Sequence, residues 1–301
     1  WLERWTHKPK VAGSTPAPAT ICATVIKKFL QKIFKKVSYY FFIKLYGKIN
    51  GIIKPKDDKR IKVQELNIEN NLNYRVYKIN DGRLYTDRIQ DAAVILEDKI
   101  IEGPSFQLRY THDSKIYNSK TADNIVFTKG TPRKLKKLNG TVLSLLTGGG
   151  GNNNYWHWMV DVLPRLFLCS KVMDLNEIDY FLLPDEINKF QSQTLDCLNI
   201  PKNKRLSSEK FRHITAKKLI VTDHPVVISG DATKDTHNIP KWIVFWLKNI
   251  FIEKRKTETI KNKINFYIDR DDKKNNFLPQ RFISNEQEVK DFLFKRNFSS
   301  I

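Results

Sequence analysis

Strand-length apolar runs alternate with helix-length segments along most of the chain, and this alternation limits its fold more than any other feature. Apolar runs that predict buried strands lie at 91–97, 124–128, 141–146, 179–184, 218–222 and 264–268. Segments with a helical pattern lie at 155–172, 189–198, 239–253 and 285–296. This order is typical of α/β folds with a mainly parallel sheet. We therefore expect an α/β protein in which the charged segment 254–263 separates two units.

The composition predicts a packed protein and leaves a strong positive charge to be explained. Of the 301 residues, 41% are hydrophobic and 12% aromatic, which excludes wholesale disorder. The formal net charge is +21, and residues 1–60 hold 14 of the 53 Lys and Arg but three of the 32 acidic residues. The remaining excess is scattered among acids, without a zinc-finger, RNP-like or helix-turn-helix pattern. Nucleic acid is therefore not an expected partner. If the chain is not an enzyme, the alternative is a basic nucleic-acid-binding protein or a non-catalytic α/β protein.

The first sixty residues differ from the rest of the chain. The chain begins with Trp and its first methionine is Met159, so we expect residues 1–20 to be a non-native or mistranslated leader. Residues 21–60 form a basic amphipathic segment. At 25–37 the apolar residues follow the spacing of one helical face, and five lysines occupy the other. Such a helix either lies in an anionic membrane surface or packs on the body of the protein.

Two further features bear on the compartment. Within the basic segment 25–60 the longest uncharged run, 37–43, is far shorter than the roughly 20 residues that span a bilayer, so no transmembrane segment is expected. Cys22, Cys169 and Cys197 are odd in number and lack CxxC spacing, which argues against a disulfide framework or a zinc ribbon. This cysteine pattern is most consistent with a protein in a reducing compartment. We expect a cytoplasmic protein that can bind peripherally to the inner face of the membrane.

The segment 148–166 carries the most specific chemistry. Its four glycines and three asparagines predict a loop before a helix, but the Lys-Ser/Thr of a P-loop is missing. On a continuous helix His157, Asp161 and Arg165 share one face, because they are four residues apart, and their neighbours are mostly apolar. Pro164 lacks a backbone N–H, so we expect a kink or a restart of the helix there.

This spacing has two interpretations. In the first, Asp161 orients and charge-stabilises His157, whose free imidazole nitrogen serves as a general base. Arg165 then pairs with Asp161 or faces an anionic group, and Trp156 or Trp158 stacks on a sugar face. In the second, an Asp161–Arg165 ion pair lies beside a core histidine that has no catalytic role.

Two blocks of the sequence together resemble the signature of a known family. The run Asn154-Tyr155-Trp156-His157-Trp158, followed by Asp161-Val-Leu-Pro-Arg-Leu166, resembles an Asn-Tyr-x-His-Trp…Leu-Pro-Arg-Leu block. The run Phe266-Tyr-Ile-Asp-Arg270, followed by Gln280-Arg-Phe-Ile-Ser-Asn-Glu286, resembles a Tyr-Ile-Ser-Arg strand end and an Arg-x-Ile/Leu-x-Asn-Glu helix start. In this order the two blocks resemble those of glycosyltransferase family 61. The resemblance covers the chain from about residue 90 to the end. The chain departs at Asp269, where the family commonly has a small residue.

The resemblance implies a fold and a reaction. The fold is GT-B-like, with one complete Rossmann-like domain on the acceptor side at 61–256 and the beginning of a nucleotide-sugar-binding domain at 257–301. The reaction is inverting transfer of a sugar from a nucleotide sugar to a glycan hydroxyl in bacterial surface (capsular) polysaccharide biosynthesis. The implied partners are the nucleotide sugar and a glycan or lipid-linked oligosaccharide acceptor, with possible peripheral membrane contact. No cofactor and no metal are implied.

The resemblance also implies site residues. His157 or Asp161 is the catalytic base. The acceptor-binding residues are Asn154, Tyr155, Trp156, Trp158 and Arg165. Arg270 contacts the donor diphosphate, with Arg281 as a second donor-binding residue.

The chain stops at Ile301, before further strands and a Gly-rich donor segment that the resemblance leads us to expect. We therefore expect this chain to be a truncated, inactive fragment. The run Asp269-Arg-Asp271-Asp272 contains the Asp-x-Asp pattern that holds a divalent ion in GT-A transferases. After a predicted strand it indicates a solvated turn instead. The histidines are dispersed and lack an H-E-x-x-H pattern, so no metal site is expected.

Overall fold

The computed structural model describes residues 18–69, 72–87, 92–106, 109–110, 117–118, 120–146, 154–229, 231–253, 265–267 and 285–300. The chain divides into two compact units. One consists of residues 24–255, and the other of residues 1–23 and 256–301. The main sheet and the candidate site both belong to the first unit.

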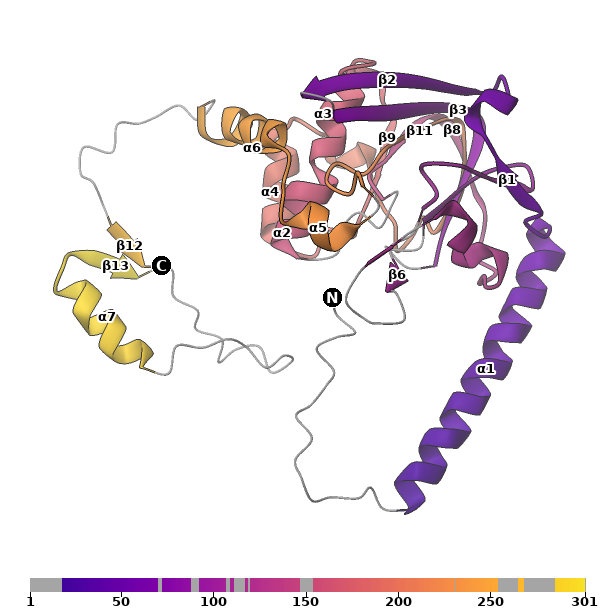
Figure 1. The fold of residues 1–301 in the computed structure, drawn as a ribbon, viewed down its shortest axis with the longest axis horizontal. Coiled ribbons are helices and arrows are strands. Elements are labelled where there is room, and N and C mark those ends of the chain that lie inside the picture. Colours follow the sequence, from indigo (N-terminus) through magenta and orange to yellow (C-terminus); the bar gives the residue numbers. More distant parts are fainter. Residues whose placement is uncertain are drawn as a thin grey trace. The chain divides into compact units, whose positions relative to one another are not determined.

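A nine-stranded sheet forms the centre of residues 24–255 (Figure 1). In spatial order its strands are β1 (Gly51–Ile53), β5 (Lys99–Ile101), β4 (Ala92–Leu96), β3 (Leu72–Thr86), β11 (His213–Thr222), β8 (Lys136–Ser144), β9 (Tyr180–Leu183) and β10 (Arg205–Ser207). The ninth strand, β2 (Ile61–Glu69), pairs with β3 off this path. A separate short pair joins β6 (Arg109–Tyr110) to β7 (Tyr117–Asn118).

The sheet has a parallel part and an antiparallel part. β8 runs parallel to β9 and to β11, and β9 runs parallel to β10. β3 runs antiparallel to β2, β4 and β11. The predicted α/β class is confirmed, and the predicted parallel pairing is found among β8, β9, β10 and β11. The antiparallel part differs from a simple Rossmann-like domain, in which helical crossovers join parallel strands.

Helices pack against one face of the sheet. They are α2 (Tyr155–His157), α3 (Pro164–Ser170), α4 (Lys189–Cys197) and α6 (Lys241–Lys248). Successive residues of a strand point to opposite faces. Leu143 therefore joins the core cluster that contains Trp158 and Leu166, whereas Val142 joins a second cluster with Leu219. Burial of both faces explains why these strands read as continuous apolar runs.

Shorter helical elements complete the first unit. They are α5 (Ala232–Thr236), the 3-10 turns Pro55–Asp57, Thr121–Asp123, Ile125–Phe127, Leu175–Glu177 and Lys202–Lys204, and the π turns Trp158–Val162 and Asn249–Glu253. The helix predicted at 239–253 is therefore found as α6 followed by a π turn.

The run 124–128 was predicted to be a strand, and that prediction is wrong. It forms a 3-10 helix at Ile125–Phe127 because Asn124 caps it. The Asn124 Oδ1 accepts the N–H of Val126 at 3.0 Å, and its Nδ2 donates to the carbonyl of Ser105 at 2.8 Å. Val126 is fully buried. The apolar character of this run thus indicated its burial but not its conformation.

α1 (Pro18–Tyr46) contains the predicted amphipathic helix. The side chains at 26–37 are exposed all round, including Phe34 at 68%. The C-terminal turns pack on the sheet, where Phe42 is fully buried with its ring centroid 4.9 Å from that of Tyr85. Within the described part of the chain, no helix is both long enough and apolar enough to cross a membrane.

The second unit contains a short βαβ element. β12 (Asn265–Tyr267) pairs in parallel with β13 (Phe298–Ser300), and α7 (Glu286–Phe294) lies between them in sequence. Arg270 and Arg281 lie outside the described residues.

We predict that Phe42→Ala lowers the free energy of unfolding by about 3–5 kcal/mol, because truncation of a buried Phe leaves a cavity under α1. Phe41→Ala is the matched control, since this neighbour is 51% exposed. It should change the free energy of unfolding by less than about 0.5 kcal/mol. Urea unfolding measures both values, and equal losses would contradict the assignment of Phe42 as the anchor of α1.

Candidate functional site

The candidate site lies where two neighbouring parallel strands end. β8 pairs with β11 so that Leu143 lies opposite Ile220. The chain after β8 leads to α2, and the chain after β11 continues as Asp223-His224. In α/β sheets, side chains that follow adjacent parallel strands collect at the carboxyl edge, where ligands commonly bind.

The helix after β8 is interrupted by a π turn. The Asn154 Oδ1 caps α2 by accepting a backbone N–H at 2.8 Å. At Trp158–Val162 the helix widens, and the Leu163 N–H bonds to the Trp158 carbonyl at 3.0 Å. Pro164 follows as the first residue of α3. Because Pro164 has no N–H, a regular helix cannot continue through it. The predicted kink or restart is found as a π turn followed by the start of α3 at Pro164.

His157 and Asp161 form a close hydrogen-bonded pair. The His157 Nδ1 lies 2.6 Å from the Asp161 Oδ2, and the exposed fractions of the two side chains are 21% and 5%. An ionised carboxylate only accepts hydrogen bonds, so the proton of this bond belongs to Nδ1. The Nε2 of a neutral His157 then carries a free lone pair. A histidine held in this way by a carboxylate is suited to act as a general base.

His224 faces the same carboxylate from the chain after β11. Its Nδ1 accepts the backbone N–H groups of Val226 and Val227 at 3.1 and 2.9 Å. The neutral ring therefore carries its proton on Nε2, which lies 3.9 Å from the Asp161 Oδ1. Burial lowers the pKa of His224 to about 3, with Arg165 also lowering it and Asp161 raising it. The ring is therefore neutral near pH 7.

Arg165 places a positive charge beside the pair. Its side chain is fully buried, and its Nε donates to the backbone carbonyl of Asp161 at 2.8 Å. Burial lowers its pKa to about 10, while Asp161 and Asp223 raise it. Arg165 thus stays charged near neutral pH. Asp223 accepts hydrogen bonds from the Arg75 Nε and the Tyr77 hydroxyl, both at 3.0 Å.

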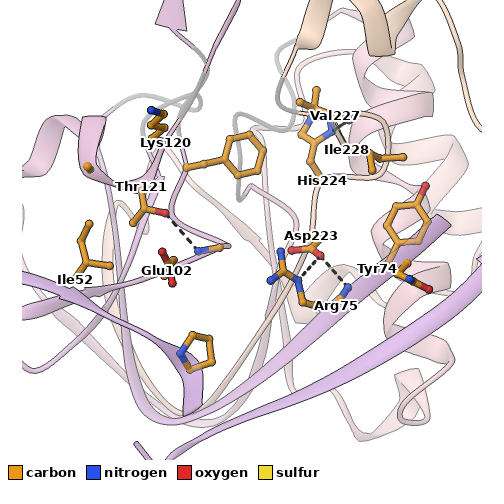
Figure 2. Close-up of a pocket in the computed structure, with 15 residues that line it drawn as sticks. Ile52, Tyr74, Arg75, Glu102, Lys120, Thr121, Asp223, His224, Val227 and Ile228 are labelled. Carbon is orange, nitrogen blue, oxygen red and sulfur yellow. Dashed lines mark hydrogen bonds and ion pairs between the residues drawn. The ribbon is translucent and has the colours of Figure 1, made fainter. Parts of the chain in front are cut away.

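A cavity of about 530 Å³ lies beside His224 (Figure 2). Figure 2 shows the Arg75–Asp223 ion pair in it, with Tyr74 nearby. The lining also includes Glu102 and Lys120. The volume lies within the roughly 300–1,000 Å³ of small-molecule sites. The charged side chains of both signs in the lining suit a polar ligand.

The structure changes the interpretation of two predicted acceptor-binding residues. Trp158 is fully buried, and its Nε1 donates to the Thr194 Oγ1 at 2.8 Å. Arg165 is also fully buried. Neither side chain reaches the surface, which corrects the expectation that both contact an acceptor directly. Tyr155 is 59% exposed, and Trp156 packs edge-on against His157 with ring centroids 5.0 Å apart.

Sequence reasoning missed the residues that reach the site from other strands. His224 had been considered only among dispersed histidines, and Asp223, Arg75 and Tyr77 had not been considered. One local signal was present, because Asp223 and His224 directly follow the predicted strand 218–222. Among the residues that the structure describes, no group of three or more His, Cys, Asp or Glu is placed to hold a metal ion. The Asp-x-Asp pattern at 269–272 lies outside them.

Comparison with known proteins connects this site to a family. A family model described as Glycosyltransferase 61 matches residues 155–301. Over this stretch the chain belongs to glycosyltransferase family 61. The match begins at the first residue of α2 and includes His157, Asp161 and His224. Family membership identifies a transferase and indicates a nucleotide sugar and a glycan acceptor as substrates. Comparisons with curated proteins and with solved structures gave no match.

We predict that stability falls in mild acid because His224 is buried in its neutral form. Below its ordinary pKa of 6.5 the unfolded residue binds a proton, whereas the folded one does so only near pH 3. Unfolding then takes up a proton, so the free energy of unfolding falls by about 1.4 kcal/mol per pH unit between these values. His213, whose pKa burial lowers to about 4, adds a similar slope over its own range.

The variant His224→Asn isolates this contribution, because its side-chain oxygen can accept the backbone N–H groups but does not titrate. Between pH 7 and pH 5 its free energy of unfolding should fall by about 2 kcal/mol less than that of the wild type. The exposed His237→Asn is the control. Urea titrations at the two pH values give the result, and equal losses in wild type and His224→Asn would refute the assignment.

Proposed function

We propose that the protein is an inverting glycosyltransferase in which His157 is the general base. The observation that carries the proposal is the 2.6 Å hydrogen bond between the His157 Nδ1 and the Asp161 Oδ2, at the start of the segment that matches the family. His157 is favoured over Asp161 as the base because the carboxylate is 5% exposed and is already bonded to the imidazole. Asp161 serves to orient the ring and to stabilise the imidazolium.

The proposed step moves one proton and exchanges one bond. The His157 Nε2 removes the proton of an acceptor hydroxyl while its oxygen attacks the anomeric carbon of the donor sugar. The bond from that carbon to the diphosphate breaks on the opposite face, so the configuration inverts. The nucleoside diphosphate leaves with the electron pair. The proton stays on His157, whose positive charge is balanced by Asp161.

In this proposal, different residues bind the acceptor and the donor. The exposed Tyr155 and the partly exposed Trp156 offer ring faces to acceptor sugars. Arg270 and Arg281 neutralise the donor diphosphate. The βαβ element of the second unit is consistent with the beginning of a nucleotide-binding domain in a GT-B arrangement. No metal or cofactor takes part in the proposed step.

We further propose that the acceptor belongs to bacterial surface polysaccharide biosynthesis, and that the protein works in the cytoplasm at the inner membrane face. The feature that supports the membrane location is α1. Between residues 26 and 37 it exposes large apolar side chains, such as Phe29 and Phe34, together with five lysines and no acidic residue. A basic amphipathic helix of this kind binds anionic lipid surfaces. There it brings the site close to lipid-linked acceptors.

The base assignment predicts a specific loss of turnover. His157→Asn should lower kcat by about 100- to 10,000-fold, because the general base is removed. The KM for the nucleotide sugar should change little. The exposed His237→Asn is the matched control. The turnover of both variants is measured with a panel of nucleotide sugars, by detecting the released nucleoside diphosphate. Wild-type turnover by His157→Asn would rule out this base.

The membrane proposal predicts binding to acidic vesicles. The wild type should sediment with phosphatidylglycerol vesicles but not with phosphatidylcholine vesicles, and added salt should weaken binding because it screens the lysines. Phe29→Glu combined with Phe34→Glu should abolish binding, since both side chains are more than half exposed and carry the apolar face. A matched surface control is Val244→Glu on α6, which is 55% exposed. Equal sedimentation with both lipids would contradict the proposal.

A further inference from the structure

Asp161 and His224 each present a buried polar atom to the other. The Asp161 Oδ1 and the His224 Nε2 are shielded from solvent, and neither has a hydrogen-bond partner among the described residues. They lie 3.9 Å apart. One atom is an acceptor and the other carries a proton. Buried polar groups are rarely left unpaired, because each costs free energy when it is removed from water. A shift of about 1 Å brings the two atoms to hydrogen-bond distance.

The orientation of His224 is fixed by its own loop and not by the helix that carries Asp161. The backbone N–H groups of Val226 and Val227 bind its Nδ1. The loop is anchored in turn, because the Tyr74 hydroxyl donates to the carbonyl of Pro225 at 3.0 Å. The Trp242 Nε1 donates to the Tyr74 oxygen, also at 3.0 Å. His224 therefore holds its proton-bearing nitrogen toward Asp161 from a rigid support.

The two oxygens of Asp161 face different histidines. The Oδ2 accepts the short bond from His157, and the Oδ1 faces His224. Without a partner on the Oδ1, the carboxylate is free to rotate about its last bond and to weaken the bond to His157. A donor on the Oδ1 removes that freedom. Because the His224 ring is neutral, it provides this donor without adding a second positive charge next to Arg165.

We propose that His224 is a positioning residue whose Nε2–H holds the Asp161 carboxylate so that its other oxygen stays aligned with His157. The inference rests on the proposed function for its effect on turnover. The contact itself is independent of that function.

Two variants separate the two hydrogen-bonding roles of His224. In His224→Asn the side-chain oxygen stands as many bonds from Cβ as Nδ1 does, so it keeps the loop N–H groups. Its amide nitrogen is one bond short of the position of Nε2 and does not reach Asp161. In His224→Gln the amide nitrogen stands as many bonds from Cβ as Nε2 does, so it keeps the donor. We expect His224→Asn to lower kcat by about 10- to 100-fold, with KM within about threefold of wild type. His224→Gln should retain kcat within about threefold of wild type.

A spectroscopic measurement tests the same contact without turnover. Nitrogen-detected NMR of the imidazoles should show His224 with its proton on Nε2, and the Nδ1–H of His157 should give a strongly downfield proton signal. This signal should persist in His224→Gln and move upfield in His224→Asn. An unchanged His157 signal and unchanged kcat in His224→Asn would overturn the inference, as would equal kcat losses in both variants.

The two arms distinguish the possible failures. If no nucleotide sugar is turned over but the His157 signal responds to His224→Asn as expected, the contact stands and the proposed function fails. If His224→Asn does not fold, the wild-type spectrum decides, and a His224 proton on Nδ1 would overturn the inference.

Discussion

The buried carboxylate of Asp161 is the group on which the rest of the site depends. A carboxylate that is 5% exposed needs hydrogen bonds and nearby positive charge to stay ionised. His157 donates to one oxygen, and His224 turns its proton-bearing nitrogen toward the other. Arg165 supplies buried positive charge and donates to the backbone carbonyl of the same residue. The geometry that makes His157 a candidate base therefore follows from accommodating one negative charge inside the core.

The sheet brings these groups together from separate segments. β8 and β11 are parallel neighbours, so the helix that follows one and the loop that follows the other meet at one edge. β3 runs antiparallel to β11 and brings Tyr74 and Arg75 to the same edge. The two residues hold the chain after β11 at Pro225 and Asp223, respectively. The antiparallel part of the sheet thus fixes the loop that carries His224, although it lies outside the stretch that matches the family.

Local relations were predictable from the sequence, and relations across the sheet were not. The His157–Asp161 contact follows from their spacing on one turn, and it persists although the turn is a π turn and not an α turn. The position of His224 depends on the pairing of β8 with β11, which no local pattern specifies. β2 and β3 were missed because polar residues interrupt their apolar ones, and most of β2 is exposed on the edge of the sheet. The strand predicted at 124–128 failed because the side-chain hydrogen bonds of Asn124 outweighed the β propensity of the apolar residues.

The central claim is that His157 and Asp161 act as one unit in sugar transfer. A double-mutant cycle on kcat with His157→Asn, Asp161→Asn and the combined variant tests it most directly. Residues that act as a unit give strongly non-additive losses. We predict that the kcat of the combined variant lies within about threefold of the kcat of the slower single variant. Losses that multiply would contradict the account, because they would show two independent contributions and not one oriented base.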